Sequence, residues 1–413
     1  MQPRIYALLL TSCAIGPWAR AGESDSAPGG APLNWTRFRG PACGVSPWTN
    51  APAAWDGATG AGVLWKTPLA LTGVSSPVLW GSVLFITEGN EKDRAVLAFD
   101  ARDGRQLWRR VVPDGGEGTP LPPVSDYGLA IPTPTCDADG VYALFGTGDL
   151  AAFSHDGTPK WRMFLGRPKI GYGFASSPCA VNGLVCVQFD HHARGRLLAV
   201  EAATGHTAWD QERSRVASWS SLLVVSDADG KPLVVANANG STTAYDLTGR
   251  MVWDVDGATG EVAPSPAWWE GRIYAVNIGS RLYCHQVRGA VEKLWEYRGH
   301  LSDTASPIVV DGLFFMTTGS GVVSCLDAKT GEKLWTQRLA GAYASLVSSG
   351  NRIYMLGRDG TMRIFAAERA FRLLGACTLG EDVDATPAMT NGRFYIRGSR
   401  HLWCLGANAA REP

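Results

Sequence analysis

The chain has 413 residues, of which 49 are Gly, 16 are Trp and only 18% are charged, and its 38 basic side chains balance its 38 acidic ones. A hydrophobic content of 45% excludes an intrinsically disordered chain, and the zero net charge offers no general attraction to phosphate backbones, so nucleic acid is not an expected partner. Glycine well above its usual share of about 7% indicates short strands joined by tight turns.

The first 21 residues carry the pattern of a secretory signal peptide. Arg4 precedes an apolar run over residues 5–15, and small residues flank Arg20 at a cleavage position after Ala21. The run is too short for a bilayer core that needs about 20 residues. A second interpretation takes the stretch Leu-Thr-Ser-Cys ending at Cys13 as a lipoprotein box, with Cys13 as a lipid anchor. Both interpretations predict export to the periplasm or cell envelope.

After the signal peptide we expect a flexible lead-in over residues 22–33, one folded domain over residues 34–406 and a tail over residues 407–413. The lead-in is rich in Gly, Ser, Ala and Pro, which is typical of a linker. No segment beyond the signal peptide is long and apolar enough to predict a membrane span.

A Ser or Thr followed by Pro or Leu recurs eight times along the folded domain. The copies are separated by 39 to 44 residues, apart from a first gap of 57. This is the period of a four-stranded propeller blade, so we predict an all-β, eight-bladed β-propeller of four-stranded antiparallel blades. The eight copies are Ser76-Pro77, Thr133-Pro134, Ser177-Pro178, Ser221-Leu222, Ser265-Pro266, Ser306-Pro307, Ser345-Leu346 and Thr386-Pro387.

A second pattern marks the outer hairpin of each blade. A small residue, an acid, a Gly and a Trp stand at positions 1, 3, 7 and 11 of residues 98–108, 199–209 and 325–335. The glycines, Gly104, Gly205 and Gly331, are expected at turns that require a positive φ. The Trp is expected to pack against the neighbouring blade. The full set is Trp65, Trp108, Trp161, Trp209, Trp253, Trp295 and Trp335; in the seventh copy we expect Leu374 to replace the ring.

The last repeat predicts how the ring of blades closes. Residues 385–405 hold three strands and no outer strand with its Trp, whereas residues 63–69 form a single strand ahead of the first repeat. We therefore predict that the N-terminal strand 63–69 completes the eighth blade, which removes the exposed sheet edges of an open array.

The nine cysteines would suggest disulfides in an exported chain. Three of them, Cys284, Cys325 and Cys404, occupy the small-residue position of the outer hairpin, and three more fall inside predicted strands, so we expect small buried hydrophobic residues there. The patterns leave open whether Cys43 and Cys377 are free or paired.

These repeats resemble those of pyrroloquinoline quinone (PQQ)-type β-propellers. A closer resemblance, to exported PQQ-like repeat proteins of the planctomycete type, rests on residues 35–46 (WTRFRGPACGVS), 218–221 (SWSS) and 396–402. It covers about residues 34–406 and implies the fold. The superfamily includes quinoprotein dehydrogenases and the non-catalytic propeller lipoprotein of the outer-membrane β-barrel assembly machinery.

The resemblance implies two functions of different kinds. The first is a non-catalytic binding or scaffold module with envelope proteins as partners, without cofactor, metal or catalytic residues. The second is a PQQ-dependent alcohol or sugar dehydrogenase, which would hold the quinone with Ca²⁺ at the axis. Those enzymes typically use a disulfide between adjacent cysteines, and this chain has no adjacent pair. Binding of a small ligand or glycan at the axial mouth is the third possibility.

Six residues are candidates for the axis, each with a structural alternative. Asp303, Asp382 and Asp384 precede inner strands, where they would bind a cation or polar ligand or simply be solvated. Arg39 and Arg397 would face an anion or bond to carbonyls. Trp219 replaces a small residue beside the fourth inner strand, as a stacking platform or as packing between blades.

Two further segments attract attention. Asp190-His191-His192 offers metal-ligand types, but adjacent side chains in an extended chain point apart, so a polar turn is expected. The first repeat gap contains an insertion over residues 113–132, which would serve either as a binding loop or as a cover over the first blade or the axis.

Overall fold

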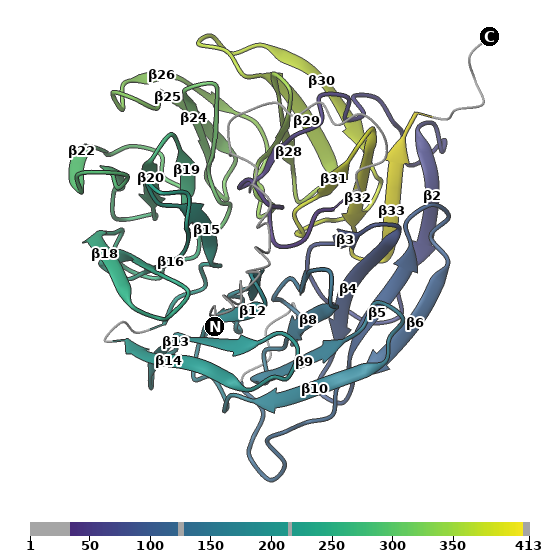
Figure 1. Ribbon diagram of the computed structural model, residues 1–413. Helices are drawn as coiled ribbons and strands as arrows, with labels where there is room; N and C mark the ends of the chain where they lie inside the picture. The colour runs from purple at the N-terminus through teal and green to yellow at the C-terminus, as the bar shows by residue number, and fades with distance from the viewer. Residues whose placement is uncertain (1–33, 123–127, 214–216, 408–413) are drawn as a thin grey trace, which may run out of the picture. The chain divides into compact units, whose positions relative to one another are not determined.

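In the described part of the chain, 33 strands form eight sheets that are arranged around a common axis (Figure 1). The structure is a computed structural model that describes residues 34–122, 128–213 and 217–407. The expected signal peptide, the Cys13 anchor and the lead-in lie outside these residues, as does nearly all of the expected tail. Within the described ranges, no helix has the length and apolar character that a membrane span requires.

Each sheet is one blade, and its strands follow one another from the axis outwards. The first four blades are β3 (Val78–Trp80), β4 (Val83–Gly89), β5 (Arg94–Asp100) and β6 (Gln106–Val111); β7 (Thr135–Cys136), β8 (Val141–Leu144), β9 (Asp149–Phe153) and β10 (Pro159–Phe164); β11 (Cys179–Val181), β12 (Leu184–Gln188), β13 (Gly195–Glu201) and β14 (Thr207–Arg213); and β15 (Leu223–Ser226), β16 (Pro232–Ala238), β17 (Ser241–Tyr245) and β18 (Met251–Asp256).

The other four blades continue the same order. They are β19 (Ala267–Trp269), β20 (Arg272–Val276), β21 (Leu282–Gln286) and β22 (Glu292–Tyr297); β23 (Ile308–Val310), β24 (Leu313–Thr317), β25 (Val322–Asp327) and β26 (Lys333–Arg338); β27 (Val347–Ser349), β28 (Arg352–Leu356), β29 (Thr361–Ala366) and β30 (Leu373–Thr378), joined by β1 (Val45–Ser46); and β31 (Ala388–Thr390), β32 (Arg393–Arg397) and β33 (His401–Gly406), completed by β2 (Val63–Pro68). The prediction of an eight-bladed propeller is confirmed.

The core lies between the blades. The second and third strands are buried on both faces, as in β4 and β5, because each blade is covered by a neighbour on either side. The outer strand β10 alternates between exposed and partly buried positions, since only one of its faces reaches the core.

Tryptophans of the outer strands join most blades to the next. The Trp161 indole donates a hydrogen bond of 2.9 Å to the Ala202 carbonyl, and its ring lies over the turn glycine Gly205 of the following blade, which has a φ of +75°. A Cβ at that glycine would lie 2.6 Å from the ring. The same contact of ring and turn glycine pairs Trp65 with Gly104, Trp108 with Gly157, Trp209 with Gly249 and Trp295 with Gly331.

The expectation that Leu374 replaces the missing ring of the seventh blade is wrong. A β-bulge in that blade pairs Ile364 with Gly375 and skips Leu374, whose side chain is 40% exposed. Trp55, which is 6% exposed, packs in the same buried cluster as Cys377 of the seventh blade and Phe394 of the eighth, with its ring 5.9 Å from that of Phe394. An aromatic ring from outside the repeats therefore packs between these two blades.

Ring closure follows the prediction. Strand β2 pairs antiparallel with β33, with Trp65 opposite Cys404, and so completes the eighth blade. The short strand β1 was not predicted. It pairs parallel with β27 and gives the seventh sheet a fifth strand.

The segment before β1 crosses the axis. We call residues 34–46 the crossing segment. It begins beside the first two blades, where Trp35 forms a bridge with Leu79 and the Thr36 carbonyl accepts a bond of 2.8 Å from the Cys136 N–H. It ends at β1 beside the seventh blade, and Figure 1 shows it in purple inside the ring.

The eight cysteines that the structure describes are all free, and seven of them are buried. Burial raises the pKa of the Cys325 and Cys404 thiols to about 12, so both remain protonated small hydrophobic groups. For Cys43 and Cys377, the structure decides between the two open alternatives in favour of free thiols.

Candidate functional site

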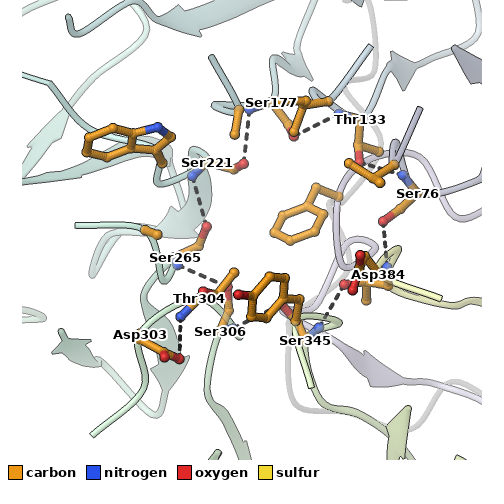
Figure 2. A pocket seen from close by; sticks show the side chains of 18 of the residues that line it. Ser76, Thr133, Ser177, Ser221, Ser265, Asp303, Thr304, Ser306, Ser345 and Asp384 are labelled. Atoms are coloured by element: carbon orange, nitrogen blue, oxygen red, sulfur yellow. Dashed lines mark hydrogen bonds between the residues drawn. The ribbon is translucent and has the colours of Figure 1, made fainter. Parts of the chain in front are cut away.

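Eight hydroxyl side chains form a closed hydrogen-bonded ring around the axis, most of which can be followed in Figure 2. In each blade the backbone N–H of the Ser or Thr ahead of the inner strand donates to the hydroxyl of the next blade, over 2.9 to 3.1 Å. The last bond runs from the Thr386 N–H to Ser76 Oγ and closes the circle. The repeated Ser or Thr is therefore explained by a bond between blades. In these bonds the hydroxyl is the acceptor, so its own proton is still available for donation.

The ring hydroxyls line a cavity of about 730 Å³ on the axis. The residue two positions before each hydroxyl also lines it, because alternate residues of an extended chain face the same side. This second layer is Val74, Ile131, Ala175, Trp219, Ala263, Thr304, Tyr343 and Asp384. Above it, Tyr172, Glu261, Asn277, Ile278 and Asp303 complete the lining.

The crossing segment closes the other side of the hydroxyl ring. Arg39 donates hydrogen bonds to the Pro266 and Pro307 carbonyls, which directly follow two ring hydroxyls, and to the Cys43 carbonyl at 2.7 Å. Its neighbour Phe38 lines the cavity from below. Among the described residues, the crossing segment therefore covers one side of the hydroxyl ring, and the second layer lies on the other side, so we call the cavity the funnel.

The three acids of the lining differ in their partners. Asp384 forms an ion pair with Arg358 at 2.8 Å, and that guanidinium lies 4.1 Å from the centre of the Tyr343 ring. Asp303 accepts backbone bonds from Gly319 and Thr304, as Figure 2 shows for Thr304. Neither Asp303 nor Glu261 has an ion-pair partner among the described residues, and the lining contains no Lys, Arg or His.

Trp219 packs against the preceding blade and also lines the cavity. Its indole N–H donates to the carbonyls of Gly171 and Gly173 in the preceding blade, at 3.1 and 2.9 Å, and its ring lines the cavity. These bonds hold Tyr172 beside it, with a ring separation of 6.0 Å. Tyr172 has a φ of +61°, which is unfavourable for a bulky residue, and its side chain is 72% exposed.

The other sequence candidates lie away from the cavity. Asp382 is exposed and outside the lining. Arg397 is buried and donates to Ser75 Oγ at 2.9 Å and to the Thr87 carbonyl. Burial lowers the pKa of both Arg39 and Arg397 to about 10, and each remains charged at neutral pH. Both arginines therefore donate hydrogen bonds to oxygen atoms of the protein, which is the alternative to binding an anion.

The insertion after the first blade packs against the second. Asp114 pairs with Arg167 at 2.6 Å, and Asp149 of β9 accepts a bond of 2.8 Å from the Gly115 N–H. Ile131 then brings the end of the insertion to the cavity wall. Residues 123–127 lie outside the described part. The insertion thus covers a blade and also contributes to the axial site.

Around Asp190 the structure shows an ion pair. Asp190 and Arg213 are buried together at 3.2 Å, and His191 forms a bridge with Arg194 in a tight turn. Over the described ranges, no three His, Cys, Asp or Glu side chains converge as a metal site.

Comparison with known proteins places the chain in a family. The family model described as "Outer membrane protein assembly factor BamB" matches residues 49–187, 155–312 and 292–373. The chain belongs to the BamB family. It is 27% identical over 323 residues to the outer membrane protein assembly factor BamB of Yersinia pestis, an alignment that covers 73% of this chain and 76% of the relative.

Two solved structures share the fold of this BamB-family propeller. BamB from Moraxella catarrhalis has a TM-score of 0.57 at 14% identity and covers 84% of this chain and 95% of its own. Quinohemoprotein alcohol dehydrogenase from Comamonas testosteroni has a TM-score of 0.64 at 14% identity and covers 92% and 82%. The chain is thus a PQQ-like repeat β-propeller related to BamB, and it shares its fold with a quinohemoprotein dehydrogenase.

The axial cavity does not fit PQQ with Ca²⁺. A hard cation needs several converging oxygen ligands, and the described residues hold no such group of acids. The quinone itself carries carboxylates, whereas the described lining of the cavity includes two acids without an ion pair to any described residue and no basic side chain. The acidic side chains of the funnel therefore favour a positively charged ligand over an anionic one.

Proposed function

We propose that this BamB-family propeller is a non-catalytic binding or scaffold module that acts in the periplasm or cell envelope and supports the assembly of outer-membrane proteins. The axial cavity carries this proposal: its hydroxyls, aromatic rings and unpaired acids can bind a ligand, and no described residues there form a metal site. Family membership supplies the class of partner, namely envelope proteins. The opening segment, residues 35–46, supports the narrower placement among exported planctomycete-type propellers.

The alternative, a PQQ-dependent alcohol or sugar dehydrogenase, has less support. Its structural argument is the likeness to a quinohemoprotein dehydrogenase, which at 14% identity concerns the fold alone. The lining acids oppose an anionic quinone, as described above. The two functions therefore differ in a measurable way, because only one of them includes turnover.

Two measurements test the proposal together. First, the purified chain is incubated with PQQ and Ca²⁺ and offered a panel of alcohols and sugars, with an authentic quinoprotein dehydrogenase as the positive control. We expect no dye reduction by the chain; substrate-dependent reduction would overturn the proposal. Second, deletion of the gene in its own host should lower the amount of folded β-barrel protein in the outer membrane, with recovery on re-expression. Unchanged barrel levels would contradict the assembly role.

A further inference from the structure

One side of the axial mouth presents several side-chain hydrogen-bond acceptors, and one of them is a buried amide oxygen. Asn277 is only 1% exposed, and its Nδ2 donates to the Thr259 carbonyl at 2.9 Å, which fixes the orientation of the amide. Its Oδ1 is buried and has no hydrogen-bond partner among the described residues. A buried acceptor without a donor is unfavourable, so a ligand that brings an N–H group to this position would be stabilised.

The charge of this side is also uncompensated. Glu261 precedes the inner strand of the blade that carries Asn277, and Asp303 precedes the inner strand of the next blade. An ionised carboxylate can only accept hydrogen bonds. The third acid, Asp384, provides an internal comparison, since it is already paired with Arg358. Among the described residues, the mouth therefore contains one acid in an ion pair and two acids without a cationic partner.

Aromatic and apolar side chains adjoin these acceptors. Trp219 and Tyr172 come from the two preceding blades, and Ile278, which follows Asn277, is 53% exposed at the rim. An aromatic face attracts a cation, and an apolar rim covers the methylene stem that carries one. Tyr172 keeps its exposed position in spite of its positive φ, because the Trp219 indole bonds to the carbonyls on either side of it.

We propose that the axial mouth binds a basic segment of an extended peptide, with a lysine or arginine side chain inserted between the aromatic pair and the acceptors of the fifth and sixth blades. The ammonium or guanidinium group would donate to Asn277 Oδ1, Asp303 and Glu261. A cavity of about 730 Å³ lies in the range of ligand pockets and is large enough for the side chains of a short segment. This inference rests on the proposed function, since it names what the binding module holds.

The test uses fluorescence anisotropy of the purified chain with a labelled, end-capped heptapeptide that contains two lysines. Matched peptides carry glutamine or glutamate in place of the lysines, and spermidine serves as a free amine. We expect the lysine peptide alone to bind, with an affinity that falls as salt is raised from 0.05 to about 0.5 M because the contacting charges are partly exposed. Equal binding of the glutamine peptide would overturn the inference.

Matched variants locate the site. Asp303→Asn together with Glu261→Gln keeps the shape of both side chains and should weaken peptide binding about tenfold or more, as the loss of charge-assisted bonds implies. Asp303→Asn alone is compared with Asp382→Asn, which removes the same charge from an exposed residue outside the lining and should change binding less than twofold. Equal weakening by these two single variants would show a general charge effect and overturn the site.

Two further outcomes are decisive. If spermidine binds as tightly as the peptide and competes with it, the site recognises a free amine, and the inference that its ligand is a peptide is overturned. Absence of any binding by the lysine peptide, in a chain whose thermal melt is unchanged, would overturn the inference itself. Neither result touches the proposed function, which the dye-reduction and barrel-assembly measurements test separately.

Discussion

Replacing Gly205 by Ala tests the contact that joins the second blade to the third. The glycine has a φ of +75°, and a Cβ there would lie 2.6 Å from the Trp161 ring. The positive φ costs an Ala about 1–2 kcal/mol, and the enforced overlap adds about 1–3 kcal/mol. We therefore expect Gly205→Ala to lower the free energy of unfolding by about 2–5 kcal/mol.

A matched glycine separates the two contributions. Gly230 lies in the turn between β15 and β16 with a φ of +80°, and a Cβ there would meet nothing within 4 Å. Gly230→Ala should therefore lose only the backbone contribution of about 1–2 kcal/mol. The difference between the two variants measures the contact with the ring.

The assay is urea denaturation followed by tryptophan fluorescence and by circular dichroism, with coincident transitions as the condition for extracting a free energy. A double-mutant cycle adds Trp161→Phe, whose smaller ring should make the alanine at position 205 less harmful, with a coupling of about 1–3 kcal/mol. Equal losses in Gly205→Ala and Gly230→Ala, or a coupling near zero, would refute the reasoning.

Three other predictions follow from the ring, the seventh blade and the buried histidines. Ser306→Ala should lower the free energy of unfolding by about 1–3 kcal/mol, because it leaves the buried N–H of Ser265 without its acceptor. Ser306→Thr keeps the hydroxyl and should retain most of the stability in the same denaturation assay. Trp55→Ala should lower the free energy of unfolding by about 3–5 kcal/mol, and Leu374→Ala should lower it by less than about 0.5 kcal/mol, because only the first side chain is buried. The reverse order of the two variants in thermal melts would contradict the packing of Trp55 between the seventh and eighth blades. Burial lowers the pKa of His191 and His285 in the folded state, so the unfolded chain takes up protons first as the pH falls through about 6.5. The free energy of unfolding should therefore decline from pH 7.5 to 5.5. It should decline less in the variant that carries both His191→Gln and His285→Gln.

The candidates for the axial site show how far local reasoning reaches. Asp303 and Asp384 are candidates because they precede inner strands, and Trp219 is one because it replaces a small residue beside such a strand; the structure places all three in the cavity lining. Asp382 stands two residues before Asp384, where strict alternation of an extended chain would place both side chains on one face, yet it is exposed and lies outside the lining.

Other lining residues had weak signals or none. The Gly-Tyr-Gly stretch at Tyr172 indicated a turn but not its position beside Trp219. Glu261 lies between repeats, and Asn277 follows a second strand, where its pattern matches that of an ordinary loop residue. Phe38 reaches the axis only because the crossing segment passes beneath the hydroxyl ring.

The sequence by itself determined the number of blades, their four-stranded order and the closure by β2, because each depends on a pattern that repeats along the chain and that tight turns impose locally. Only the tertiary structure decided what the axis contains. The cyclic hydroxyl bonds join residues that are 39 to 57 positions apart, and up to 310 apart where the circle closes. Trp55 and the crossing segment belong to no repeat, and their places depend on which surfaces the closed ring leaves uncovered. The excess of Gly and Trp in the composition is thus explained in part by the contacts between blades. The lining of the funnel, in contrast, is formed by side chains that come together only when the ring of blades is closed.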